Sequence, residues 1–382
     1  MRCVVILSPL LPCSGNTSTV GRISEHFTKR GIECVSCTPT HFVAENKCSV
    51  KLLNIFIEKK CAEALLLLHA VKSGVCLQCR CNVPCKLRVN YGIVFGGTDI
   101  NEDRHNGNKQ TILKDTIKSS VFCVAFTEDL KQIALTICPK SNIHVYPQAV
   151  DYTMFKSHAV SENTPDLKSP ILFIIPSNIR PVKNPLFLLE DFWKWSVSQR
   201  PKYDIRLLVI GNILDEAYSE TFFQKLSALK LRYSSKVNVS PEGKQTQNLQ
   251  TWLNKTNGDR VLFSPAVPRH EFQKLLSNFT FAVVNTSNSE GMASSLLEAM
   301  SMNIPVLARD IPGNSAVINH DLNGCLFLNP DEFIFSAMKL ITDKEYRLSL
   351  ITAAQKSICK VYNPHIEAEF YLKLFQKHFS VL

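Results

Sequence analysis

The sequence predicts an α/β protein with two parallel-sheet domains, and three observations support this. Short apolar runs alternate with amphipathic stretches along the whole chain, which is the pattern of βαβ units. The alternation stops at a polar stretch rich in Ser, Pro and Asn that ends near Pro170, and then starts again. A length of 382 residues is long for one core and sufficient for two. We place the domains at 1–155 and 156–360, with a C-terminal helix at 361–382 packing across the seam.

The expected elements follow in chain order. Buried strands are predicted in the first half at 3–9, 63–70, 91–97 and 121–127. A helix at 18–31 lies between the first two strands, with Gly31 as its C-terminal cap. In the second half, strands are predicted at 171–177, 205–211, 260–264, 281–285 and 304–308. Helices are predicted there at 186–199, 269–278 and 294–302, and an amphipathic helix at 364–379 ends the chain.

Composition restricts the class of protein. The net charge is +10, but no long basic run is present, so we expect no nucleic-acid partner. An anionic small ligand or peripheral contact with an anionic membrane surface remains compatible with this charge. The sequence contains no stretch of about 18 uncharged apolar residues, so we predict no membrane span.

The N-terminus and the glycosylation sequons bear on location. The start MRCVVILSPLLPC can be interpreted as a secretory signal, but a proline interrupts it and no small-x-small cleavage site follows. We interpret it as a first buried strand. The sequons at Asn278 and Asn285 bracket an apolar strand pattern, where glycans are hard to fit. We expect a cytoplasmic chain, with secretion as the alternative.

The segment SEGMASSLLEAM, residues 289–300, carries two glutamates eight positions apart, Glu290 and Glu298. It follows a predicted strand, so Glu290 falls on a strand-to-helix loop and Glu298 falls in the helix. Ser294 and Ser295 suit a helix start, whose backbone amides bind phosphate well. The glutamates are separated by roughly 10–12 Å along the helix axis, too far to share a metal. Two interpretations of the segment are open. It binds the two ends of an extended ligand with a diphosphate between them, or it is an ordinary amphipathic helix.

The same region resembles the family-4 glycosyltransferases, in which two glutamates stand at this spacing. The resemblance continues through EAMSMNIPVLARDIPGNSAVINHDLNGCLF and extends upstream to VPRHEFQKLLSNFTFAVVNTSNSEG. GGTDINED, VAFTEDLKQ and VYPQAVDYTMF match segments of the family's N-terminal domain and hinge. The resemblance implies the GT-B fold, in which two Rossmann-like domains face a cleft. The N-terminal domain would be on the acceptor side, and the C-terminal domain would bind the nucleotide sugar.

The family's residue roles transfer to matching positions. Glu290 would contact the transferred sugar, and Glu298 the ribose hydroxyls. The amides after Glu290 would hold the diphosphate, at Gly291, Met292, Ala293 and Ser294. The resemblance implies no metal requirement and no cofactor besides the nucleotide-diphosphate sugar, which is a substrate.

Further donor-site candidates lie after two other predicted strands. Arg180 and Lys183, in PSNIRPVKNP, are the cations expected for a donor diphosphate, although each also fits a solvated turn. The commonest family pattern has arginine five residues before the lysine, where this chain has Asn178, and Arg180 is expected to replace it. Gly211 matches the family's glycine at a third strand end, and also fits a plain turn.

The first half offers weaker candidates. Gly15 lies at the first strand-to-helix loop and partly matches a glycine-rich loop of the family. Thr98 and Asp99 fit an acceptor or a sugar, or a turn. Gly96 stands where many relatives have histidine. His69 is expected to line the cleft or to be a satisfied buried histidine.

The segment CLQCRCNVPC adds four thiols, at Cys76, Cys79, Cys81 and Cys85. Such thiols can bind zinc or another soft metal, form disulfides or remain free. Structural zinc sites usually use two separated pairs, so we expect free thiols and name no metal ligand.

Together these observations predict a retaining glycosyltransferase that moves a hexose-type sugar from a nucleotide-diphosphate sugar to an acceptor. The acceptor is a glycan, small molecule, lipid or protein. The first alternative is a weak or inactive relative that binds nucleotide sugars in a binding or regulatory role, because Gly96 and Asn178 depart from the family pattern. The second is a zinc-dependent interaction module built on the cysteine loop.

Overall fold

The protein folds into two compact units. The structure is a computed structural model that describes residues 3–11, 14–43, 48–79, 85–150, 170–233 and 259–379. The first unit contains Met1–Ala149, Glu290–Met292 and Tyr362–Leu382, and the second contains Val150–Ser289 and Ala293–Val361. The predicted domain boundary at 155/156 falls outside the described residues. The C-terminal segment is grouped with the first unit.

The first unit is built on a six-stranded sheet whose strands are all parallel. Its strands are β1 (Cys3–Leu7), β2 (Glu33–Cys37), β3 (Ala62–Leu68), β4 (Tyr91–Val94), β5 (Phe122–Ala125) and β6 (Ile143–Val145). They lie in the order β2-β1-β3-β4-β5-β6. The direction of winding changes between β1 and β3, and ligands of such sheets bind beyond the carboxyl ends of the strands at that point.

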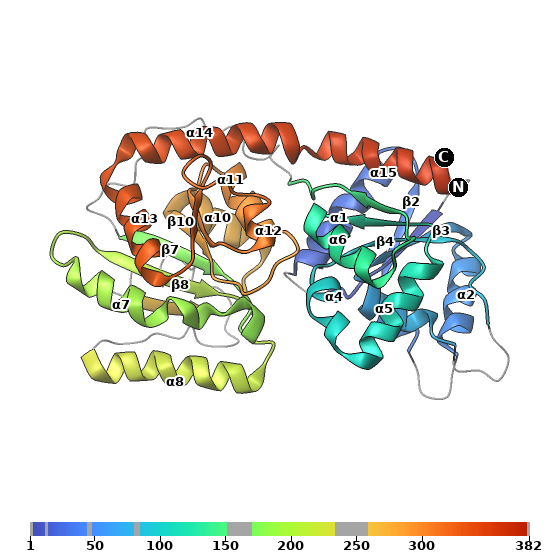
Figure 1. Ribbon diagram of the computed structural model, residues 1–382, viewed down its shortest axis with the longest axis horizontal. Coiled ribbons are helices and arrows are strands. Elements are labelled where there is room, and N and C mark those ends of the chain that lie inside the picture. Colours follow the sequence, from blue (N-terminus) through green and yellow to red (C-terminus); the bar gives the residue numbers. More distant parts are fainter. Residues whose placement is uncertain are drawn as a thin grey trace. The chain divides into compact units, whose positions relative to one another are not determined.

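Helices pack around this sheet (Figure 1). The α-helices are α1 (Gly15–Thr28), α2 (Ser49–Lys59), α3 (Ala70–Gly74), α4 (Thr98–Asn101), α5 (Gly107–Ser119), α6 (Glu128–Ile137) and α15 (Pro364–His378). Short 3-10 turns are η1 (Pro39–His41), η2 (Val75–Leu77) and η3 (Asp103–His105). Past the end of α1, Gly31 has a φ of +76°, the left-handed conformation predicted for a glycine there. The rings of Phe27 on α1 and Phe375 on α15 pack edge to face at 4.6 Å.

The second unit repeats the plan. Its strands are β7 (Ile171–Pro176), β8 (Ile205–Ile210), β9 (Val261–Ser264), β10 (Thr280–Asn285), β11 (Val306–Arg309) and β12 (Cys325–Phe327). They are all parallel and lie in the order β12-β11-β10-β7-β8-β9. Counted from β7, this is the strand order of the dinucleotide-binding Rossmann fold, and its switch point lies between β7 and β10.

The helices of the second unit follow the predicted alternation. They are α7 (Leu189–Ser198), α8 (Glu216–Tyr233), α10 (Arg269–Phe279), α11 (Ser294–Ser301), α12 (Pro312–Ser315), α13 (Pro330–Thr342) and α14 (Lys344–Val361), with 3-10 turns η5 (Pro181–Lys183) and η6 (Pro185–Phe187). A cluster of aromatic side chains lies within the core: Phe173 on β7 packs against Phe192, Trp195, Phe281 and Phe333. This core fixes the strand ends that carry the candidate site.

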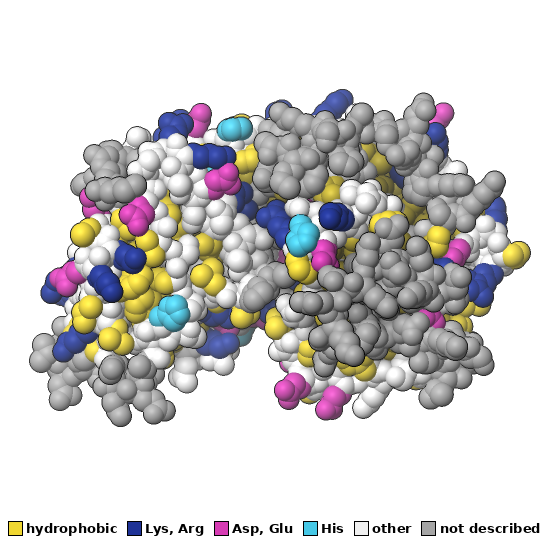
Figure 2. All heavy atoms as spheres, turned by 180° about the vertical axis from the view of Figure 1, so that it is seen from behind, with side chains coloured by type: hydrophobic (Ala, Val, Ile, Leu, Met, Phe, Trp, Pro, Cys, Tyr) yellow, Lys and Arg dark blue, Asp and Glu magenta, His cyan; other side chains and the backbone are white. Residues whose placement is uncertain are grey.

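Charged side chains of both signs lie on the surface. On the face that Figure 2 shows, Lys and Arg side chains are interspersed with acidic, polar and apolar ones. Within the described residues, no helix has the length and apolar character needed to cross a membrane.

Candidate active site

The strongest candidate site lies at the switch point of the second unit. The loop after β7 carries Arg180 and Lys183, and the loop after β10 leads to α11. Because β7 and β10 are neighbours and parallel, their carboxyl ends open at the same edge of the sheet. The sequence predicted both loops as ligand-binding, and the topology brings them together.

Hydrogen bonds fasten these two loops to each other. The Thr286 hydroxyl donates to the Lys183 carbonyl oxygen at 3.1 Å. The backbone N–H of Asn288 donates to the carbonyl oxygen of Val182 at 2.8 Å, and its side-chain amide donates to the Pro181 carbonyl oxygen at 3.3 Å. The loop carrying the cations is therefore held by the loop that leads to the helix.

Arg180 is half-buried in this arrangement. Its Nε is buried and has no hydrogen-bond partner among the described residues. A buried guanidinium donor without a partner is costly, and an anionic ligand would satisfy it. Arg180 is therefore a candidate for binding an anion.

The structure adds a cation that the sequence analysis missed. Arg309 ends β11, the strand on the other side of β10. Its guanidinium lies 4.3 Å from the centroid of the Phe187 ring and donates to the Asn288 side-chain oxygen, while its Nε is buried without a partner in the described chain. Burial lowers the pKa of Arg309 from its ordinary value. Only its position at a strand end, in VLARD, could have indicated it.

The first turn of α11 offers uncapped backbone amides. The helix starts at Ser294 as predicted, but its N-cap is Ala293, no side chain caps it, and its first turn has no acidic residue. By contrast, the Ser14 side chain caps α1 by accepting from the Thr17 N–H, and Gly15 is the first, exposed residue of that helix. The amides of α11 are thus more available for a phosphate than those of α1.

Glu298 lies one turn into α11 and is half-buried. Its Oε1 accepts hydrogen bonds from Arg269 Nε at 3.3 Å and from Gln273 Nε2 at 3.2 Å. Both donors come from α10, so the carboxylate is oriented by the neighbouring helix. This placement is compatible with a ribose contact.

Glu290, Gly291 and Met292 are grouped with the first unit. The Asn101 side chain donates to the Glu290 carbonyl oxygen at 3.2 Å, and the Gln148 side chain donates to the Met292 carbonyl oxygen at 2.8 Å. A Cβ on Gly291 would lie 2.9 Å from the Gly97 Cα. The close approach that Gly291 permits is therefore to the backbone of Gly97.

Asn178 and Gly211 brace the loops after β7 and β8. The Asn178 side-chain oxygen accepts from the backbone N–H of Asn212 at 3.0 Å. A Cβ on Gly211 would lie 2.2 Å from the Ser177 carbonyl oxygen, so only glycine fits. Both residues shape the edge that carries Arg180, and Asn178 has a structural task where the family pattern has arginine.

In the first unit, Asp99 is fully buried. Its carboxylate accepts backbone hydrogen bonds from Ala70, Gly96 and Ile100 at 2.7, 3.0 and 3.0 Å. These bonds hold the loops after β3 and β4 together. Thr98, half-buried, begins α4.

His69 follows β3 with a φ of +71°, an unusual conformation for a non-glycine residue. It is 2% exposed, and burial lowers its pKa. Its Nδ1 accepts from the Lys72 N–H at 3.2 Å. A Cβ on Gly96 would lie 3.2 Å from His69 Cδ2, so a larger residue at Gly96 would require the His69 ring to shift by a few tenths of an ångström.

The cysteines of the segment CLQCRCNVPC do not form one cluster. Cys76 is buried and donates to the Pro39 carbonyl oxygen at 3.3 Å, and burial raises its pKa to about 12. Cys81 falls outside the described residues. Cys79 and Cys85 lie together with Cys48, which the sequence analysis did not single out.

Comparison with known proteins identifies the class first. The fold is similar to that of Anabaena HepE, solved in complex with UDP and glucose, with a TM-score of 0.72, 13% identity, and 98% of this chain and 99% of that chain covered. It is equally similar to sucrose-phosphate synthase from Thermosynechococcus elongatus, with a TM-score of 0.72, 13% identity and 99% of each chain covered. These folds and the two parallel sheets define the GT-B class of glycosyltransferases.

The family follows from the sequence. The chain belongs to the glycosyl transferases group 1, whose family model matches residues 159–357, and it is therefore a glycosyltransferase. It is 29% identical over 382 residues to glycosyltransferase 1 domain-containing protein 1 of Xenopus tropicalis. The alignment covers 97% of this chain and 96% of that relative. The family resemblance predicted from the motifs is confirmed.

Proposed function

We propose that this chain is a retaining glycosyltransferase that transfers a hexose-type sugar from a nucleotide-diphosphate sugar. One observation carries the proposal: half-buried cations and an uncapped helix end surround the switch point of the second unit. Arg180 and Arg309 each have a buried Nε without a partner in the described chain, and Lys183 lies on the same loop as Arg180. That set matches a diphosphate in charge and hydrogen-bonding capacity.

The chemistry required of the site is the departure of a nucleoside diphosphate. Negative charge grows on the leaving phosphate as the bond to the sugar breaks, and preorganised cations and amides stabilise that charge. Arg180, Lys183 and the first turn of α11 supply this stabilisation without a divalent ion. The acceptor attacks from the face that the leaving group vacates, so no protein nucleophile is assigned. Glu290 contacts the transferred sugar, and Glu298 binds the ribose hydroxyls.

The test starts from binding. Purified protein is screened by thermal shift against UDP-, GDP- and ADP-sugars, since a ligand that binds only the native state raises the midpoint. The donor that raises it is then assayed for hydrolysis and for transfer, with retention read from the anomeric configuration of the product. If a donor raises the midpoint but is neither hydrolysed nor transferred to any class of acceptor, the chain binds that nucleotide sugar without acting on it as an enzyme. No shift with any donor would contradict the proposed site.

A further inference from the structure

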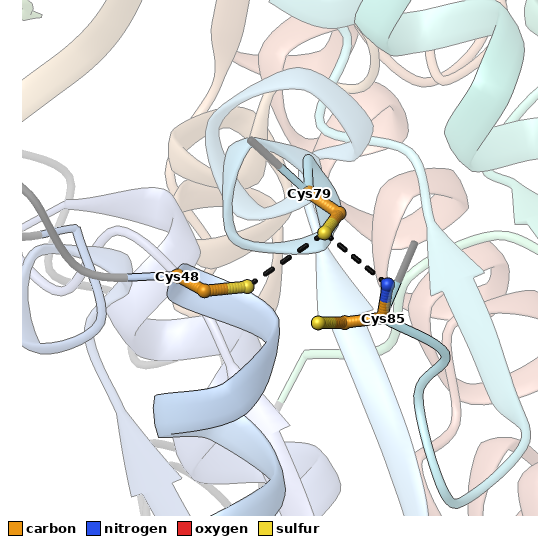
Figure 3. Close-up of side chains that lie close together, drawn as sticks. All are labelled: Cys48, Cys79 and Cys85. Carbon is orange, nitrogen blue, oxygen red and sulfur yellow. Dashed lines mark hydrogen bonds between the residues drawn. The ribbon is translucent and has the colours of Figure 1, made fainter. Parts of the chain in front are cut away.

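Three cysteine side chains converge in the first unit, apart from the residues assigned to donor chemistry. Cys48, Cys79 and Cys85 have Sγ atoms that all lie within 4.8 Å of one another. Figure 3 shows the three side chains directed toward a common point from two segments, the start of α2 and the chain after η2. The Sγ atoms of Cys48 and Cys79 are 3.8 Å apart.

This spacing fits a metal ion better than a disulfide. Zinc–sulfur bonds of about 2.3 Å at tetrahedral angles place neighbouring sulfurs about 3.8 Å apart. A disulfide requires about 2.05 Å between the sulfurs. The Cys48–Cys79 separation of 3.8 Å equals the first value, so an ion can enter with little movement of these two side chains.

Backbone groups with partial positive charge lie next to two of the three sulfurs. Cys48 is the N-cap of α2, and no side chain caps that helix, so its thiol lies at the positive end of an 11-residue helix. The Cys79 Sγ accepts a hydrogen bond from the backbone N–H of Cys85 at 3.2 Å. The sulfurs of Cys48 and Cys79 therefore each lie beside a positively polarised part of the backbone.

The two segments are held in place independently of any ion. Asn54, on α2, donates its side-chain N–H to the Lys86 carbonyl oxygen at 2.9 Å and accepts from the Arg88 backbone N–H at 3.0 Å. The chain just after Cys85 is therefore docked on the helix that Cys48 begins. All three cysteines are half-buried, which leaves a route for an ion.

We propose that Cys48, Cys79 and Cys85 bind one zinc ion. Binding releases the thiol protons and replaces them with three zinc–sulfur bonds, which connect the segment after η2 to the start of α2. Zinc is chosen because soft thiolate ligands select it over magnesium and calcium. With three protein ligands among the described residues, a further coordination position remains for water or another donor. Free thiols were expected here from the sequence because structural zinc sites usually use two separated pairs, and Cys48 was not among the cysteines considered.

The first experiment measures the zinc content of the full-length protein, purified without chelator. We expect about one zinc per chain, as for a mononuclear site. Cys48→Ser, Cys79→Ser and Cys85→Ser should each lose most of it. Cys61→Ser is the matched control, because Cys61 is an exposed cysteine of the same unit, and it should retain zinc. Zinc content that is absent from the wild type, or equal in all four variants, would overturn the proposal.

A second measurement remains informative if a variant fails to fold. The wild-type protein is treated with iodoacetamide before and after a zinc chelator, and labelled cysteines are located by mass spectrometry. Cys48, Cys79 and Cys85 should become reactive only after chelation, whereas Cys61 should react in both cases. Replacement of zinc by cobalt should give a sulfur-to-cobalt charge-transfer band that is lost in Cys79→Ser. A Cys48–Cys79 disulfide in the purified protein, or chelator-independent labelling of all three, would show that no metal is bound.

Discussion

Lys183 provides the most direct test of the donor site at the scale of single residues. It lies on the loop after β7, whose backbone is fastened to the loop after β10 through the Lys183 carbonyl oxygen. Lys183→Ala removes the cation but keeps that backbone bond. We expect transfer to fall at least about tenfold, or about 1.4 kcal/mol of lost transition-state stabilisation. Steady-state kcat/KM measures it, and Lys225→Ala, an exposed lysine on α8, is the control that should not change.

Arg180 tests whether a neighbouring residue has replaced the arginine of the family pattern. Because its Nε is buried without a described partner, we expect Arg180→Ala to impair transfer nearly as much as Lys183→Ala. Arg180→Lys should restore part of the loss, since it keeps the charge but not the planar donors. An Arg180→Ala protein that is folded and fully active would make Arg180 a solvated loop residue.

The two glutamates should separate binding from turnover. Glu298 is oriented by Arg269 and Gln273, and we expect Glu298→Gln to weaken binding of the free nucleoside diphosphate as well as of the donor. Glu290→Gln should leave nucleotide binding intact and lower kcat. Calorimetric titration with the bare nucleotide distinguishes them, and equal weakening by both substitutions would contradict these roles.

Among the structural elements, the N-terminus of α11 can be tested by giving it a cap. An aspartate at Ala293 would accept hydrogen bonds from the first-turn amides and would place a negative charge where the phosphate is expected. Ala293→Asp should therefore weaken nucleotide binding at least about tenfold, or about 1.4 kcal/mol. Ala293→Ser adds a neutral cap and should cost less. Tighter binding to Ala293→Asp than to wild type would exclude a phosphate at this helix end.

Hydrophobic periodicity predicted the buried strands, but it missed two strands that lie at sheet edges. The strands that begin at Ile171 and Thr280 and the helix that begins at Ser294 follow from apolar runs and a small-residue helix start. β2 was missed because most of its residues are exposed or half-buried, so no apolar run marks it. β12 was missed because it has three residues, too few to show a pattern.

Some residues of the candidate sites could also be predicted from the sequence, and others could not. Arg180 and Lys183 could be predicted because they lie on one loop next to a strand. Arg309 and Cys48 are harder to predict, because their partners lie far away in the sequence: the strand order brings Arg309 to its partners, and the packing of α2 on the chain after Cys85 brings Cys48 to its partners. The tasks of Asn178 and Gly96 were likewise hidden, because each depends on a contact with a loop from another strand.

At the scale of the whole molecule, the first unit is completed from the opposite end of the chain. α15 packs on α1 through the fully buried Glu367. Its carboxylate accepts from Arg22 Nε and pairs with His26 Nε2, both at 2.7 Å, and it accepts from the Ala149 backbone N–H at 2.9 Å. Removing a partner of a carboxylate so buried is strongly destabilising. The fold of the first unit therefore depends on residues that follow the second.

This carboxylate gives the first unit a defined response to acid. Burial alone would raise the pKa of Glu367, but the charge of Arg22 and the hydrogen bonds from His26, Arg22 and Ala149 outweigh it and lower the pKa from 4.5 to about 2. Because the folded-state pKa is depressed, the stabilisation is fully present above about pH 4.5 and is lost as the pH falls toward 2. The shift corresponds to about 3 kcal/mol.

Glu367→Gln should therefore lower the free energy of unfolding at pH 7 by about 3 kcal/mol or more. The difference from wild type should shrink as the pH falls from about 5 toward 2, because the wild-type carboxylate then becomes protonated in the unfolded state and afterwards in the folded one. Urea unfolding at a series of pH values measures this. Glu369→Gln is the matched control, because Glu369 is an exposed glutamate on the same helix, and it should change stability little at any pH. Stability curves of wild type and Glu367→Gln that run parallel from pH 7 to pH 3 would mean that the buried carboxylate is not the group that ties α15 to the first unit.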